Sequence, residues 1–132
     1  MKFYMHYLLI FIVVAFTSCG QSKSDDYTDM KAEQFQNDVS HDFVQLIDVR
    51  TLEEFKAGHL KHAINVDFKS GDFIKNIEKL NSSKPVYIYC KSGNRSKKSV
   101  SAFKKVGFTT IYNLKGGFLV WKDKGLPVVK GK

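Results

Sequence analysis

The chain has 132 residues, which is enough to bury one core and too few for two ordinary domains. A hydrophobic share of 43% argues against wholesale disorder, so we expect a single folded domain. The formal net charge of +8 favours an anionic ligand, a phosphate backbone or an acidic membrane surface, and it does not choose among them.

The first 18 residues have the pattern of an export signal. They carry an early lysine, Lys2, then an apolar run over residues 7–16, and then small residues. The run is shorter than the roughly 20 residues of a membrane-spanning helix, so a permanent anchor of that kind is the weaker interpretation. We therefore expect residues 1–18 to be a signal peptide and the mature protein to lie in the cell envelope.

Cys19 follows the small residues Thr17 and Ser18. This sequence resembles the lipobox of bacterial lipoproteins, in which the cysteine is acylated, although Phe16 stands where that motif most often has leucine. The resemblance implies a lipid anchor at Cys19, on the periplasmic side of a bacterial membrane or on the outer membrane. Ordinary secretion and an uncleaved anchor are the alternatives.

The segment after Cys19 is polar from residue 20 to residue 29 and lacks apolar periodicity, which predicts a solvated tether. We place the tether at residues 19–26 and the folded domain at residues 27–132. Such a tether would hold the domain away from a membrane.

The domain alternates between short apolar runs and segments with helical spacing of apolar residues. The apolar runs predict three strands and a final extended piece, at residues 43–49, 84–90, 108–114 and 126–129. The helical spacing predicts five helices, at residues 31–39, 51–58, 71–83, 96–107 and 116–125. Thr51 is placed to cap the second helix, and Gly58 is placed to end it.

The run at residues 84–90 is apolar at consecutive positions, which indicates a strand covered on both faces inside a sheet. Repeated alternation of strand and helix predicts an α/β domain with a mainly parallel sheet and helices on both faces. Ligands of such folds lie beyond the carboxyl ends of the strands. A functional site is therefore expected directly after this strand.

Cys90 stands at that position, followed by the loop of residues 91–96 and a predicted helix. With Cys19 acylated, it is the one free thiol of an exported domain, where oxidising conditions call for burial or a chemical purpose. Gly93 and Asn94 tolerate positive φ, so the loop can turn its amides inward as an anion nest. Such a nest at a helix N-terminus favours the thiolate, which is a nucleophile.

Three segments in this order resemble the single-domain rhodaneses, the thiosulfate sulfurtransferase family. They are LIDVRTLEEFKAGHLKHAINV at residues 46–66, VYIYCKSGNRS at residues 86–96 and IYNLKGGFLVWKDKGLPV at residues 111–128. The similarity runs from about residue 27 to residue 129. It implies a rhodanese-like three-layer α/β domain, with a mostly parallel five-stranded sheet and a catalytic cysteine that cycles through a persulfide.

The resemblance also implies roles for individual residues. Cys90 is the sulfur-carrying cysteine, and the substrate-binding loop after it consists of Lys91, Ser92, Gly93, Asn94, Arg95 and Ser96. Structural support falls to Asp48, Arg50, Glu54 and His59, with Arg50 paired to Glu54 or bonded to backbone beneath the loop. Gly116, Gly117 and Trp121 match an architectural turn and a core tryptophan. His62 stands where the family usually has glycine, which predicts a local change in backbone geometry.

The implied reaction is sulfur transfer. The Cys90 thiolate takes the outer sulfur of thiosulfate or a related small anionic donor and passes it to cyanide or a thiol, without a metal or an organic cofactor. Lys91 and Arg95 add positive charge for the donor. A thioredoxin-like protein is a further candidate partner.

Alternatives to this reaction remain open. A rhodanese-like module would bind a partner or sense redox state through Cys90 without turnover. A cysteine-dependent phosphatase or arsenate reductase is disfavoured, because four residues separate Cys90 from Arg95 and the phosphatase pattern has one more. A metal site of His59, His62 and Cys90 matches no standard zinc spacing. Nucleic-acid binding is supported by net charge alone, so we expect none.

Overall fold

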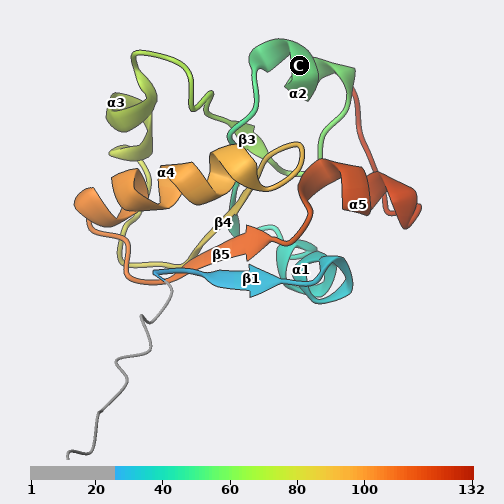
Figure 1. Ribbon diagram of the computed structural model, residues 1–132, viewed down its shortest axis with the longest axis horizontal. Coiled ribbons are helices and arrows are strands. Elements are labelled where there is room, and N and C mark those ends of the chain that lie inside the picture. The colour runs from blue at the N-terminus through green and yellow to red at the C-terminus, as the bar shows by residue number, and fades with distance from the viewer. Residues whose placement is uncertain (1–25) are drawn as a thin grey trace, which may run out of the picture.

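The computed structural model describes residues 26–132. Five parallel strands form one sheet in the order β1-β5-β4-β2-β3 (Figure 1). The strands are β1 (Thr28–Met30), β2 (Gln45–Asp48), β3 (Ile64–Asn65), β4 (Val86–Tyr89) and β5 (Ile111–Leu114). The helices are α1 (Ala32–Val39), α2 (Leu52–Ala57), α3 (Phe73–Ile77), α4 (Asn94–Lys105) and α5 (Gly117–Asp123). The α/β class and the parallel sheet predicted from the sequence are confirmed.

Two groups of buried side chains cover the two faces of the sheet. Phe73 of α3 and Phe103 of α4 belong to one group. Phe35 of α1 and Trp121 of α5 belong to the other. Figure 1 shows α3 and α4 together on one side of the sheet and α1 on the other. The domain therefore has three layers, as expected from the alternation of strands and helices.

The middle strand, β4, divides its side chains between these two groups. Val86 and Ile88 pack with α3 and α4, whereas Tyr89 packs with α1 and α5. All three side chains are buried. Because β5 and β2 flank this strand and helices cover both of its faces, every position along it favours an apolar residue. The predicted interior position of this strand is confirmed.

The predicted caps of α2 are also confirmed. Glu54 N–H donates to Thr51 Oγ1 at 3.3 Å, and Thr51 N–H donates to the Glu54 carboxylate at 3.0 Å. This reciprocal pair is a capping box, and Gly58 stands at the C-terminal cap. The capping box fixes the Glu54 carboxylate at the N-terminus of α2.

The two edge strands, β1 and β3, were not predicted. β1 begins inside the polar stretch of residues 20–29, and Met30 is its one buried side chain. β3 has two residues. An edge strand pairs on one side and is less covered than a central one, so it needs little apolar sequence. Apolar periodicity therefore carried no signal for either strand.

The described residues leave out the predicted signal peptide at residues 1–18, the predicted acylation site Cys19 and the predicted tether up to residue 25. Within residues 26–132, none of the helices is long and apolar enough to span a bilayer. The final piece at residues 126–129 is extended where Val129 pairs with His59 in an antiparallel bridge.

His62 has a left-handed backbone with a φ of 67°. Apart from Lys132 at the C-terminus, it is the one non-glycine residue within residues 26–132 with positive φ. Glycine adopts this conformation freely, whereas other residues adopt it with strain of about 1 kcal/mol. The sequence predicted a local change in backbone geometry at His62. The backbone there instead has the left-handed geometry that glycine favours.

Replacing His62 with glycine should therefore raise the free energy of unfolding, by about 0.5 to 1 kcal/mol in urea titrations. The change gives up a contact between the His62 imidazole and the Asp42 carboxylate at 3.2 Å, but the two side chains are 39% and 76% exposed, and such surface contacts contribute little. Asp42→Asn is the control, because it weakens this contact and leaves the backbone of His62 unchanged. A less stable His62→Gly variant would show that the left-handed strain is not relieved.

Candidate active site

The loop between β4 and α4 lies at the carboxyl end of the central strand (Figure 1). Cys90 directly follows β4. α4 begins at Asn94, two residues before the predicted start. Gly93 precedes this helix with a φ of 101°, in the left-handed region that glycine favours. The chain therefore reverses over a short distance and brings the first turn of α4 against the thiol.

Two donors contact the sulfur of Cys90. The Gly93 amide donates to Sγ at 3.0 Å, and the Ser96 hydroxyl lies 3.4 Å from Sγ in donor geometry. Both groups stabilise negative charge on the sulfur. The sequence predicted inward-facing amides in this loop, and Gly93 supplies one. It did not assign a contact to the Ser96 hydroxyl.

The thiol itself is buried, since only 1% of the surface of Cys90 is exposed. The side chains of Lys91, Ser92 and Asn94 are exposed around it. Any reactant must therefore reach Sγ with a slim terminal atom, or the loop must move to admit it. The sequence predicted where the thiol lies and left burial open as the alternative to a chemical purpose.

The loop is held by the turn between β5 and α5. Both glycines of this turn, at residues 116–117, have positive φ. The two amides that follow, of Phe118 and Leu119, donate to carbonyl groups of the Cys90 loop at 2.8 and 3.0 Å. A Cβ on Gly117 would lie 2.6 Å from the carbonyl oxygen of Cys90, so glycine alone permits this approach. The turn at residues 116–117 is therefore hydrogen-bonded to the backbone of residues 90–91, at the start of the loop that carries the thiol, which we call the thiol loop.

Arg95 forms a bidentate ion pair with Glu54, with N–O distances of 2.7 and 2.9 Å. The pair joins the first turn of α4 to the N-terminus of α2. Hydrogen bonds from Arg95 and from Thr51 lower the pKa of Glu54 to about 2 from its ordinary 4.5. The predicted pairing of Arg50 with Glu54 is wrong, because Arg95 and Thr51 already take both carboxylate oxygens.

Arg50 pairs with Asp48 instead. Its Nε and Nη2 donate to the Asp48 carboxylate at 3.0 and 2.6 Å, and both side chains are buried. Nη2 also donates to the Gly58 carbonyl at 2.6 Å, which is a backbone bond of the kind predicted as the alternative. The guanidinium lies 4.1 Å from the centre of the Phe118 ring. Arg50 therefore supports the first turn of α5, whose amides hold the thiol loop.

His59 is buried beside α2. Its Nδ1 lies 2.8 Å from the carbonyl oxygen of Phe55, and the two rings stack with centroids 3.7 Å apart. These are the contacts of a packed, hydrogen-bonded residue. His62 pairs with Asp42, and nowhere in residues 26–132 do three histidine, cysteine or acidic side chains gather as a metal site would require.

Replacing Glu54 with glutamine should lower the free energy of unfolding by about 1 kcal/mol at neutral pH, because both partners of the ion pair are partly exposed. Glutamine can keep the capping box and loses the charge that pairs with Arg95. Since the pKa of Glu54 is lowered to about 2 from 4.5, this stabilisation is complete above pH 4.5 and is lost as the pH falls toward 2.

Urea titrations across the acid range measure this dependence. Glu53→Gln is the matched control, because it removes a charge from the same exposed turn of α2. The gap in stability between the wild type and Glu54→Gln should close in acid, while Glu53→Gln stays near the wild type. A gap that persisted below the pKa of Glu54 would rule out the ion pair as its cause.

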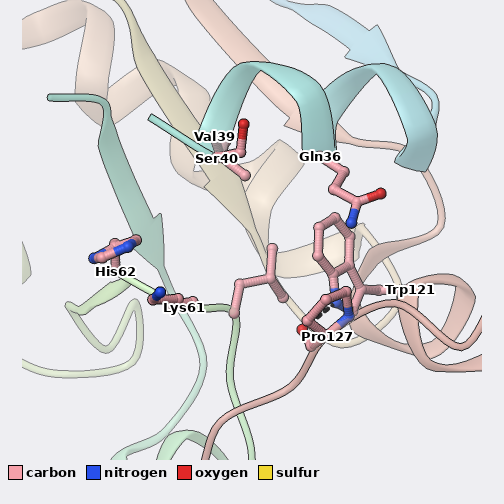
Figure 2. A pocket seen from close by; sticks show the side chains of 8 residues that line it. Gln36, Val39, Ser40, Lys61, His62, Trp121 and Pro127 are labelled. Carbon is pink, nitrogen blue, oxygen red and sulfur yellow. Dashed lines mark hydrogen bonds between the residues drawn. The ribbon is translucent and has the colours of Figure 1, made fainter. Parts of the chain in front are cut away.

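A cavity of about 200 Å³, drawn in Figure 2, has no residue of the loop at 91–96 in its lining. It is lined by Gln36, Val39, Ser40, Leu60, Lys61, His62, Trp121 and Pro127. Figure 2 shows Trp121 beside Pro127, whose carbonyl oxygen accepts from the indole N–H at 2.9 Å. Trp121 is buried and packs with α1, which is the position expected of a core tryptophan.

Comparisons with known proteins agree with this fold. The profile of the Rhodanese-like domain family matches residues 31–124. "Thiosulfate sulfurtransferase 16, chloroplastic" of Arabidopsis thaliana is 34% identical over 103 residues, which cover 67% of this chain and 86% of that protein. An uncharacterized protein of Bacillus subtilis, YqhL, is 44% identical over 80 residues, which cover 61% of this chain and 62% of that protein.

A solved structure is also similar. The crystal structure of a rhodanese-related protein from Thermoplasma volcanium matches with a TM-score of 0.68 at 25% identity, over 78% of this chain and 98% of that one. The family profile covers more than half of the 132 residues, including β4, the thiol loop and the turn at residues 116–117. The chain therefore belongs to the rhodanese-like domain family.

Proposed function

We propose that the protein is a sulfurtransferase, which moves a sulfane sulfur from thiosulfate or a related anionic donor to cyanide or a thiol. The observation that carries this proposal is the sulfur of Cys90, which receives the Gly93 amide and the Ser96 hydroxyl at the end of the central strand. Both contacts favour the thiolate, the form that attacks sulfur. The name of the Arabidopsis relative, a thiosulfate sulfurtransferase, supports the same reaction.

In the first step, the Cys90 thiolate attacks the outer sulfur of thiosulfate. A bond forms between Sγ and that sulfur, the S–S bond of thiosulfate breaks, and its electron pair leaves with sulfite. The negative charge ends on the outer sulfur of a Cys90 persulfide. No proton moves in this step, so no general base is needed.

In the second step, cyanide or a thiolate attacks the outer sulfur of the persulfide. With cyanide, thiocyanate leaves, and the electron pair of the broken S–S bond returns to Sγ of Cys90. The thiolate is thereby restored for the next cycle. A thioredoxin-like protein is a candidate for the thiol acceptor.

Donor binding falls to the loop of residues 91–96. Lys91 is exposed beside the thiol and supplies positive charge for an anionic donor. Arg95 shares its charge with Glu54, so its main contribution is to hold the loop in place. The burial of Cys90 favours donors with a slim terminal sulfur, such as thiosulfate or polysulfide.

The same burial favours a second function, a partner-binding module without turnover, because only 1% of the surface of Cys90 is exposed to an incoming donor. A redox-sensing module is less well supported, because oxidation of a sensor cysteine calls for an accessible thiol. A phosphatase or arsenate reductase is less well supported, because the guanidinium that would bind an oxyanion is paired with Glu54.

Turnover assays separate these functions. Thiocyanate formation from cyanide and thiosulfate, polysulfide or glutathione persulfide is expected from the sulfurtransferase. If no donor gave thiocyanate and peroxide oxidised Cys90 stoichiometrically, the redox module would replace it. Hydrolysis of an aryl phosphate by the same preparation would instead favour the phosphatase.

We further propose that an acylated Cys19 anchors the protein to the cell envelope, which is supported by the pattern of the first 19 residues. The anchor would place the thiol loop in an oxidising compartment. Fractionation of bacterial cells tests this location, and the protein is expected with the membranes.

A further inference from the structure

Ser96 has one hydroxyl proton and two acceptors within reach. Its Oγ lies 3.4 Å from Cys90 Sγ and 3.1 Å from the carbonyl oxygen of Gly93. A hydroxyl has a single proton to donate. Ser96 is fully buried, so bulk water does not compete for that proton. Its direction therefore depends on which of the two acceptors is the stronger.

The strength of the sulfur as an acceptor depends on its charge. A thiolate is a charged acceptor and outcompetes a neutral carbonyl, whereas an uncharged sulfur is a weak acceptor. In the reaction proposed above, negative charge leaves Sγ when the persulfide forms and returns when the outer sulfur is delivered. The stronger acceptor thus changes twice in each cycle.

We propose that the Ser96 hydroxyl follows this charge, donating to Cys90 Sγ in the sulfur-free protein and to the Gly93 carbonyl in the persulfide. This inference rests on the proposed sulfurtransferase function. Both acceptors already lie within hydrogen-bond distance, so rotation of the hydroxyl proton about the C–O bond is sufficient. Ser96 then stabilises the Cys90 thiolate as nucleophile and as leaving group, and it does not hold the charge of the persulfide.

This role has opposite effects on the two half-reactions. A stabilised thiolate is present at lower pH, is a weaker nucleophile once formed, and is a better leaving group. Removing the hydroxyl should therefore speed attack by the thiolate and slow discharge of the persulfide. Simple loosening of the loop would expose the sulfur and speed both half-reactions.

Ser96→Ala tests the proposal, with Ser99→Ala as the matched control. Ser99 is also fully buried on α4, and its hydroxyl donates to the carbonyl oxygen of Ser96 at 2.7 Å. Iodoacetamide alkylation of Cys90 should show a pH midpoint about one pH unit higher in Ser96→Ala. Above that midpoint the variant should alkylate about threefold faster, and cyanide should discharge its preformed persulfide about threefold more slowly. Ser99→Ala should follow the wild type.

An unchanged alkylation midpoint in Ser96→Ala, or acceleration of both reactions, would overturn the proposal. If Ser96→Ala does not fold, nuclear magnetic resonance of the wild type decides. The Lys97 amide donates to the same Gly93 carbonyl at 3.2 Å, so a second donor to that oxygen should move the Lys97 amide proton upfield when the persulfide forms. An unchanged chemical shift of the Lys97 amide proton would overturn the proposal.

The alkylation profile also separates this inference from the proposed function. If no donor forms a persulfide, the sulfurtransferase proposal fails, and with it the change of acceptor. The pH midpoint would still show whether the Ser96 hydroxyl bonds to the thiolate. If a persulfide forms and the midpoint does not move in Ser96→Ala, the inference alone fails.

Discussion

Replacing Cys90 with serine should reduce thiocyanate formation from thiosulfate and cyanide to the uncatalysed rate. A serine oxygen is not ionised near neutral pH and cannot carry a sulfane sulfur as a persulfide, so both half-reactions are lost. The variant should remain folded, because the hydroxyl is smaller than the thiol and can accept the Gly93 amide in its place. Initial rates of thiocyanate formation, with urea unfolding of the same samples, measure both effects.

Ser99→Ala is the control for this loss, since it changes a buried side chain of α4 without touching Cys90 Sγ. It should retain turnover. Equal thiocyanate formation by the wild type and Cys90→Ser would mean that the sulfur passes through another group, and the proposed chemistry would be wrong.

Replacing Gly117 with alanine should produce the largest loss of stability, on the order of 3 kcal/mol. The φ of 65° strains any side chain, and the new Cβ would lie 2.6 Å from the Cys90 carbonyl and 2.5 Å from the Lys91 carbonyl. Those oxygens are backbone atoms, so they can give way only if the thiol loop moves. Turnover should fall as well, because the amides of Phe118 and Leu119 would lose their acceptors in that loop.

Gly125→Ala isolates the contact from the backbone strain. Gly125 has a φ of 67°, and a Cβ there would meet no heavy atom within 4 Å. This control should therefore cost about 1 kcal/mol and leave turnover unchanged. Urea unfolding and thiocyanate rates compare the two variants. A Gly117→Ala variant no less stable than Gly125→Ala would show that the turn at residues 116–117 does not closely approach the thiol loop.

The position of the thiol was predictable from the sequence because it follows from the central strand. A run that is apolar at consecutive positions marks a strand covered on both faces, and parallel sheets present their sites at the carboxyl ends of such strands. β4 meets that description, and Cys90 follows it directly. The edge strands β1 and β3 lacked this signal because they are short and paired on one side.

Side-chain partners were less predictable than elements. Arg50 and Glu54 are four residues apart, a spacing that favours a pair within one helix. Arg50 instead precedes α2, and its guanidinium turns inward to Asp48 and the Gly58 carbonyl. Glu54 faces Arg95, which is distant in sequence and is brought close by the packing of α4 beside α2. Spacing along the chain carries no information about such contacts.

The support of the thiol loop was predictable only in part. The two glycines of residues 116–117 indicated a tight turn, but nothing in the sequence named the Cys90 carbonyl as the partner of the Phe118 amide. The sequence left burial and a chemical purpose as alternatives for Cys90, and the structure shows that the thiol is buried. In the proposed reaction, access of the donor to this buried thiol is therefore the step on which turnover depends.

Intact mass spectrometry of the purified protein after incubation with thiosulfate tests this step and the chemistry together. We expect the mass to increase by one sulfur atom, the increase to disappear on addition of cyanide, and Cys90→Ser to show no increase. An unchanged mass with thiosulfate and with every other sulfane donor would contradict the proposal that Cys90 carries sulfur.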